Sequence, residues 1–169
     1  MIIKVLAENT SVSNKFGSEH GLSLYIKTNT RKTLFDVGAS ELFLENAKRL
    51  SVDISDVDYL IISHGHYDHG GGLKSFLREN KKAEVFLHRL AFGKYYALRS
   101  NDELEYIGLD RDLKKNRQIV FTSDRFFVSK GIQVFSNITQ KTPLPISNRG
   151  LFMEQNGRTV WDTFVHEQN

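Results

Sequence analysis

The first half of the chain alternates short apolar runs with segments of helical spacing. Strands are expected at five apolar runs, residues 2–6, 21–27, 32–36, 60–62 and 84–88. The polar residues 28–31 join the second run to the third and predict a hairpin. A helix is expected over residues 41–50, because Ser40 can cap it and apolar residues recur there at helical spacing. Residues 73–78 favour a second short helix, whereas the polar residues 8–19 predict a loop.

The second half of the chain follows a different pattern. Residues 90–98 carry an aromatic side formed by Phe92, Tyr95 and Tyr96, and a helix is expected there. Short strand-like runs separated by polar turns follow, at residues 106–107, 118–122, 125–128, 132–135 and 158–165. Two prolines interrupt the chain within residues 142–145. The β-α-β rhythm, the absence of an internal repeat and the length predict one α/β domain over residues 1–169.

Composition and charge narrow the class of protein. Hydrophobic residues make up 40% of the chain and charged residues 25%, which is ordinary for a globular protein. The net charge of +3 is too small to imply nucleic-acid binding by itself. Residues 81–130 hold eleven Lys or Arg against seven Asp or Glu. That excess fits either a solvated face or the rim of a site for an anionic substrate.

Cysteine usage and hydropathy set further limits. The chain has no cysteine, so disulfides and thiolate metal ligands are excluded. No apolar window approaches the ~18 residues of a membrane span, and residues 1–6 are too short for a signal segment. We therefore expect a soluble, cytoplasmic protein that makes no membrane contact.

Four side chains that can bind metal follow the apolar run at residues 60–62. They are His64, His66, Asp68 and His69, and three glycines close the segment. Imidazole and carboxylate ligands suit Zn, Mn and Fe alike. Because side chains alternate along an extended segment, His64 and His66 can serve one metal, and a turn can present Asp68 and His69 to a second. Three of the six histidines fall in this stretch, which favours a metal centre over a loop with scattered surface histidines.

The same stretch carries a resemblance to a known family. The pattern His64-x-His66-x-Asp68-His69, followed by glycines, resembles the signature of the metallo-β-lactamase-fold superfamily. His66 stands where the oxygen-reducing di-iron branch has Glu, which points to the hydrolase-type branches. Four segments resemble the dihydropterin-ribofuranosylaminobenzene-phosphate synthase-like group of metal-dependent hydrolases: residues 19–23, 34–38, 44–48 and 63–69. The resemblance is good over residues 1–96 and loose over residues 130–169. It implies an αββα sandwich, with two mixed sheets face to face, helices outside and the metals at one edge.

The resemblance also implies roles for individual residues. His64 and His66 would bind the first metal ion, and Asp68 and His69 would help to bind the second. Asp68 would in addition orient the nucleophile or accept its proton. Asp36, at the end of a strand, would fix the orientation of a metal-binding histidine, or would only form a turn.

The other three histidines lie outside this motif. His20 lies in the loop expected near the metals, where it is a ligand, a substrate contact or a surface histidine. His88 ends a predicted strand and is expected to be structural. His166 and Glu167, near the carboxyl end, are expected not to bind metal.

Related proteins are longer and take further His and Asp ligands from the second half of the domain. The chain is therefore expected to be an amino-terminal part of that domain. If the site is complete, two divalent ions (Zn, or else Mn or Fe) would serve hydrolysis of a small anionic or phosphorylated substrate. If it is not, the chain would be a non-catalytic metal-binding protein or a partner-dependent fragment, prone to homo-oligomerise through an exposed edge. A nuclease of the same superfamily is a third reading, which the weak basic charge disfavours.

Overall fold

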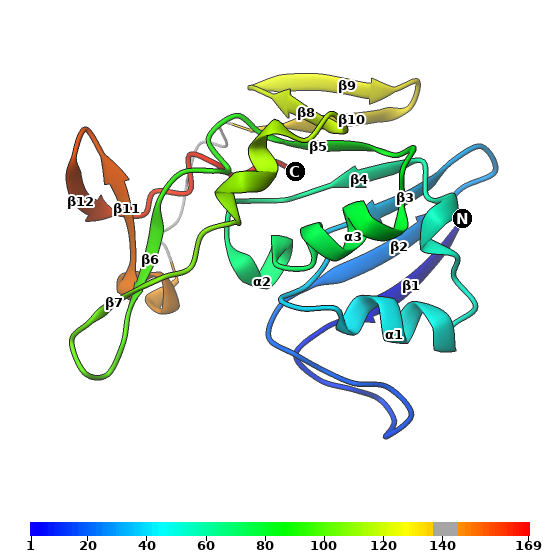
Figure 1. Ribbon diagram of the computed structural model, residues 1–169, viewed down its shortest axis with the longest axis horizontal. Helices are drawn as coiled ribbons and strands as arrows, with labels where there is room; N and C mark the ends of the chain where they lie inside the picture. Colours follow the sequence, from blue (N-terminus) through cyan, green and yellow to red (C-terminus); the bar gives the residue numbers. More distant parts are fainter. Residues whose placement is uncertain (137–144) are drawn as a thin grey trace.

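The computed structural model describes residues 1–136 and 145–169, and a six-stranded sheet lies at its centre (Figure 1). In order across the sheet, its strands are β1 (Ile2–Ala7), β2 (Ser23–Lys27), β3 (Lys32–Phe35), β4 (Tyr59–Ile61), β5 (Glu84–His88) and β8 (Ile119–Thr122). The first three pair antiparallel, whereas β3, β4, β5 and β8 run parallel. The strands expected in this half of the chain are confirmed. The parallel arrangement brings the carboxyl ends of β3 and β4 to one edge of the sheet.

Both faces of the central strands are covered, which explains their continuous apolar sequence. The covering elements are α1 (Leu42–Arg49), α3 (Leu73–Glu79), β9 (Arg125–Ser129) and β10 (Ile132–Phe135). Leu60 belongs to the main core, which Phe43 of α1 and Phe76 of α3 complete. Ile61 and Phe86 point to the opposite face and pack against the β9–β10 hairpin. Figure 1 shows the two helices on one side of the sheet and the hairpin on the other.

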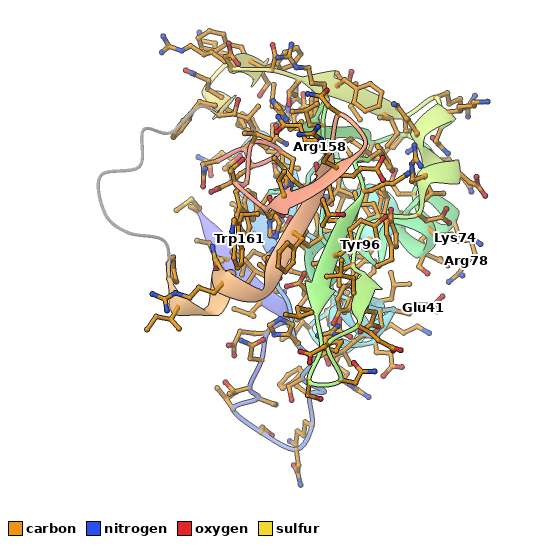
Figure 2. The ribbon with its side chains drawn as sticks, turned by 90° about the vertical axis from the view of Figure 1, so that its left-hand side faces the viewer. Glu41, Lys74, Arg78, Tyr96, Arg158 and Trp161 are labelled. Atoms are coloured by element: carbon orange, nitrogen blue, oxygen red, sulfur yellow. The ribbon has the colours of Figure 1, made fainter. Side chains whose placement is uncertain are left out.

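The helical layer follows the sequence prediction closely. Helix α1 lies within the expected residues 41–50, but Glu41 and not Ser40 is its N-cap residue. The Ser40 hydroxyl precedes the cap and accepts a hydrogen bond from the Leu42 N–H at 3.1 Å. Arg78 at the end of α3 forms an ion pair with Glu41 at 3.1 Å, which links the two helices on their outer side. Figure 2 shows Glu41 and Arg78 together at this edge of the molecule.

A four-stranded antiparallel sheet lies at the left of Figure 1, away from α1 and α3. Its strands, in order, are β12 (Arg158–Trp161), β11 (Leu151–Gln155), β6 (Tyr95–Leu98) and β7 (Leu104–Tyr106). The helix predicted over residues 90–98 is wrong, because Tyr95 and its neighbours pair with β11, opposite Met153. The last strand is shorter than predicted and ends at Trp161, after which the chain turns back toward the large sheet. Figure 2 shows Tyr96 and Trp161 on this small sheet.

The remaining elements are short: α2 (Tyr67–Gly70), η1 (Ile54–Asp56), η2 (Arg111–Lys115) and η3 (Ile146–Gly150). The α/β class is confirmed. The αββα sandwich expected from the resemblance has two outer helical layers. In residues 1–136 and 145–169 the structure has one, formed by α1 and α3 on the large sheet. Within those same residues no helix has the length and apolar character needed to cross a membrane. The interruption expected at residues 142–145 lies, except for Pro145, outside the described residues.

Candidate metal centre

The candidate ligands lie at the sheet edge where β3 and β4 end. Asp36 follows β3, and Ser63 and His64 follow β4. The two strand ends are joined by a 2.9 Å hydrogen bond from the Asp36 N–H to the Ile61 carbonyl. Asp36 has a left-handed backbone with φ of 59°, a conformation that Asp tolerates better than most residues. The parallel pairing thus places a carboxylate beside the start of the histidine-rich loop.

The Asp36 carboxylate holds residues of this loop by hydrogen bonds. It is fully buried and accepts three hydrogen bonds. Oδ1 accepts from the Ser63 N–H at 2.7 Å, while Oδ2 accepts from the Ser63 hydroxyl at 2.8 Å and from His69 Nδ1 at 2.7 Å. Burial raises the pKa of Asp36, and the hydrogen bonds from His69 and Ser63 oppose that rise. Because Nδ1 of His69 donates to a carboxylate, Nε2 is left with the lone pair that a metal needs.

His64 is held in the same way through Ser63. The Ser63 hydroxyl donates its hydrogen bond to Asp36, so its oxygen accepts one from His64 Nδ1, which lies 2.9 Å away. His64 Nε2 is then the nitrogen with the lone pair. Burial, and then the neighbouring histidines, lower the pKa of His64 to about 2. The ring is therefore neutral at physiological pH, which is the form that binds metal ions.

Three of the four predicted ligands converge on one point. Ligand atoms of His64, Asp68 and His69 lie within 4.8 Å of one another, a grouping that could hold a metal ion. His69 Nε2 lies 3.5 Å from the Asp68 carboxylate. Burial alone would lower the pKa of His69, but its contacts with Asp36 and Asp68 outweigh burial and raise it. His20 lies at the outer side of this group, with Nε2 3.4 Å from Asp68 and its side chain 72% exposed.

The fourth predicted ligand, His66, makes a different set of contacts. Its ring centroid is 4.7 Å from that of His64, but its Nε2 lies 2.9 Å from Asp162 Oδ2. Asp162 also contacts His166, and these three buried residues form a second group that could hold a metal ion. Asp162 belongs to no sequence motif, and His166 was expected from sequence not to bind metal. The only local indication was their spacing of four residues, with nothing to place them near the loop.

Two other residues weighed from sequence lie outside both groups. His88 is buried at the end of β5, where its Nδ1 lies 3.4 Å from the Leu90 N–H. Glu167 accepts a hydrogen bond from the Asn169 side chain at 3.1 Å. Neither residue is among the metal-capable groups of the described residues.

The glycines after the loop allow close contact between backbone segments. A Cβ at Gly71 would lie 2.3 Å from the Ala39 carbonyl oxygen, and one at Gly72 would lie 2.4 Å from the Val37 carbonyl oxygen. The loop therefore packs directly on the chain that follows Asp36, and the Val37 N–H donates to the His69 carbonyl at 2.8 Å. No other residue type fits at these two positions without backbone movement.

Comparison with known proteins identifies the family and the fold. The model of the metallo-β-lactamase superfamily matches residues 17–144, and the chain belongs to this superfamily. Over 98% of its length it is 30% identical to the 7,8-dihydropterin-6-methyl-4-(β-D-ribofuranosyl)-aminobenzene-5′-phosphate synthase of Methanocaldococcus jannaschii. An uncharacterised protein of the same organism is 37% identical over 68% of the chain.

Among solved structures, the fold matches Tm1679, a metal-dependent hydrolase of the β-lactamase superfamily. The TM-score is 0.78, with 31% identity over 98% of this chain. The metallo-β-lactamase-type fold expected from the sequence is thereby confirmed. The chain spans 61% of the length of the synthase, 43% of the uncharacterised protein and 59% of Tm1679.

Proposed function

We propose that this chain binds divalent metal ions through His64, His66, Asp68 and His69, two of them where the site is complete, and serves metal-dependent hydrolysis. The observation that carries the proposal is the hydrogen-bond arrangement beneath the loop. Asp36 and Ser63 accept hydrogen bonds from Nδ1 of His69 and of His64, so in the neutral rings both Nε2 atoms carry the lone pairs, beside the Asp68 carboxylate. Neutral imidazoles with a carboxylate form the donor set that Zn, Mn and Fe share, and Zn is our first choice.

The side chains divide the chemistry between them. A divalent ion bound there would lower the pKa of a water molecule to about 7 and so supply a hydroxide nucleophile at neutral pH. Asp68 is the residue placed to orient that nucleophile or to accept its proton. Asp36 holds the His69 ring, and the exposed His20 beside Asp68 is positioned to contact a substrate.

The substrate we propose is a small anionic or phosphorylated molecule met in the cytoplasm. The support is the phosphate in the name of the Methanocaldococcus jannaschii synthase and the basic excess over residues 81–130. A nuclease reading has only the superfamily behind it, since the net charge is +3.

A second candidate function is that of a metal-binding chain that needs a partner. The chain spans about three fifths of the synthase and of Tm1679. In addition, β1 is an edge strand whose Ile3 and Val5 are about half exposed, a surface on which a second copy could pack. Under this reading the donor set is the same but hydrolysis requires a further chain.

The test is metal content by elemental analysis of size-excluded protein, stripped and then reloaded with Zn²⁺ or Mn²⁺. We expect His66→Ala to lower metal content and His88→Ala to leave it unchanged, with circular dichroism confirming that both variants are folded. Equal metal content in the two variants would refute the ligand assignment. Near two ions per chain would favour the complete hydrolase site, which a screen of phosphoesters and lactones would then examine. A single weakly held ion would favour the partner-dependent reading.

A further inference from the structure

The segment that follows β12 returns to the metal loop, and three of its residues, Asp162, His166 and Gln168, are buried there. Figure 1 shows this last stretch of chain running from the small sheet back to the large one. Gln168 attaches this segment to the large sheet, because its side-chain amide donates hydrogen bonds to the Ile62 and Phe86 carbonyls at 2.8 and 3.0 Å. The Gln168 N–H also donates to the Ser63 carbonyl at 2.7 Å. The Asp162 and His166 side chains, both 0% exposed, are thereby placed directly beside His66.

The hydrogen bonds of this segment determine which nitrogens carry protons. The Gly65 N–H can only donate, so His166 Nδ1, 2.9 Å away, accepts and carries a lone pair. His166 Nε2 must then carry the proton of the neutral ring, and it donates to the Asp162 carboxylate at 3.2 Å. The carboxylate only accepts, so His66 Nε2 also donates to it at 2.9 Å. The lone pair of His66 is therefore on Nδ1.

The same assignment decides between two readings of the His66, Asp162 and His166 group. Its atoms are close enough together to hold a metal ion. A metal would need lone pairs on Nε2 of both histidines, but the Gly65 N–H commits His166 to the opposite arrangement. The Asp162 Oδ1 atom is likewise engaged, by the Phe164 N–H at 2.8 Å. The group is thus a hydrogen-bonded network, which the Tyr95 ring covers at a centroid distance of 3.9 Å from His166.

We propose that Asp162 and His166 are positioning residues that hold His66 with Nδ1 as its metal-binding nitrogen. The proposal rests on the proposed function, in which His66 is a ligand. It gives His66 the same kind of support that Asp36 gives His69, a buried carboxylate on the nitrogen that does not bind metal. Asp162 acts through His66 and makes no contact with the metal ion, and His166 aligns Asp162 while binding the loop backbone at Gly65.

Asp162→Asn is the most direct test, because it changes almost no volume. The Phe164 N–H keeps the amide oxygen at the Oδ1 position, so the NH₂ group replaces Oδ2 and faces His66 Nε2. Two donors then oppose each other unless His66 moves its proton to Nδ1. We expect the affinity for Zn²⁺, measured by competition with a chromophoric chelator, to fall about 10- to 100-fold. The matched control is Asp124→Asn, an exposed Asp outside both groups, and we expect it to leave the affinity unchanged.

A second readout does not depend on a variant folding. Long-range ¹H–¹⁵N spectra of the metal-free wild-type protein report which imidazole nitrogen is protonated, and we expect Nε2–H for His66. A proton on Nδ1 of His66 would overturn the proposal. So would an unchanged Zn²⁺ affinity in Asp162→Asn.

Two further outcomes distinguish a failure of the positioning role from a failure of the proposed metal binding. Wild-type protein that binds no Zn²⁺ would refute the proposed function itself. If Asp162→Asn and His166→Ala each remove one whole ion from a wild-type stoichiometry of two, Asp162 and His166 are metal ligands, and the positioning role is overturned while metal binding stands.

Discussion

Replacing Asp36 by Asn should weaken both the fold and the metal centre. The substitution keeps the shape of the side chain, and the amide oxygen can still accept from the Ser63 N–H as Oδ1 does at 2.7 Å. The NH₂ group then replaces Oδ2, which accepts from the Ser63 hydroxyl and from His69 Nδ1. Two buried donors would face a third donor, and His69 could relieve the conflict only by moving its proton to Nε2, the nitrogen facing Asp68.

The magnitude follows from the bonds that are lost. Hydrogen bonds to a charged group contribute roughly 1.5–3 kcal/mol each, and two of them end on Oδ2. Removing the charge returns part of the burial cost that raises the pKa of Asp36. We therefore expect a loss of about 3 kcal/mol in the free energy of unfolding, at the lower end of the ~3–5 kcal/mol found when one partner of a buried pair is removed. With an m-value of about 2 kcal/mol/M, the urea midpoint would fall by about 1.5 M.

The assay is urea unfolding of metal-free protein at pH 7, followed by Zn²⁺ competition on the folded variant. Asp53→Asn is the matched control, because Asp53 accepts from the Ser55 N–H at the start of η1 and Asn caps equally well. We expect the control to change the free energy of unfolding by less than about 0.5 kcal/mol. For Asp36→Asn, the Zn²⁺ affinity should fall at least about tenfold. A midpoint and an affinity both equal to those of the control would show that Asp36 does not organise the loop.

Two further predictions concern stability. Burial lowers the pKa of His64 to about 2 and also lowers that of His166, whereas both titrate near 6.5 in the unfolded chain. Below pH 6.5 the unfolded chain binds more protons than the folded chain, so each histidine should lower the free energy of unfolding by up to about 1.4 kcal/mol for each pH unit below 6.5. An equal urea midpoint at pH 6.5 and pH 5.5 in metal-free protein would contradict this. Gly71→Ala brings a Cβ against the Ala39 carbonyl oxygen and should lower the free energy of unfolding by about 1–3 kcal/mol. Gly150→Ala, whose Cβ would have its nearest atom at 3.8 Å, should lower it less. Equal melting temperatures of the two variants would contradict this prediction.

Local patterns in the sequence predicted most of the large sheet and its helical layer. The apolar run at residues 60–62 coincides with β4 to within one residue, because it is buried on both faces, and α1 lies where the helical spacing places it, although its N-cap is Glu41 and not Ser40. The prediction failed at residues 90–98, where helical spacing of aromatic side chains competed with pairing to a strand far along the chain. Tyr95 is buried by that pairing, which no local pattern reports.

The candidate site divides along the same line. His64, His66, Asp68 and His69 are adjacent in sequence, so ligand chemistry and spacing were enough to propose them. Asp36 required the resemblance, because a turn-forming Asp looks the same in a single sequence. Asp162 and His166 could not be found, since their place beside His66 depends on the long-range contacts that Gln168 makes with the large sheet. Those contacts exist only in the folded chain.

Each of the three histidines proposed as metal ligands is held by a different part of the chain. His69 is held by the residue that ends β3, His64 by the serine that follows β4, and His66 by the segment after β12. The first two supports are in place once β3 and β4 pair, but the third requires the last residues to dock. Metal affinity should consequently depend on the docking of residues 162–168, even though every proposed ligand lies within residues 64–69. By the same linkage a bound ion would stabilise the docked segment, because it would favour the His66 tautomer that Asp162 selects.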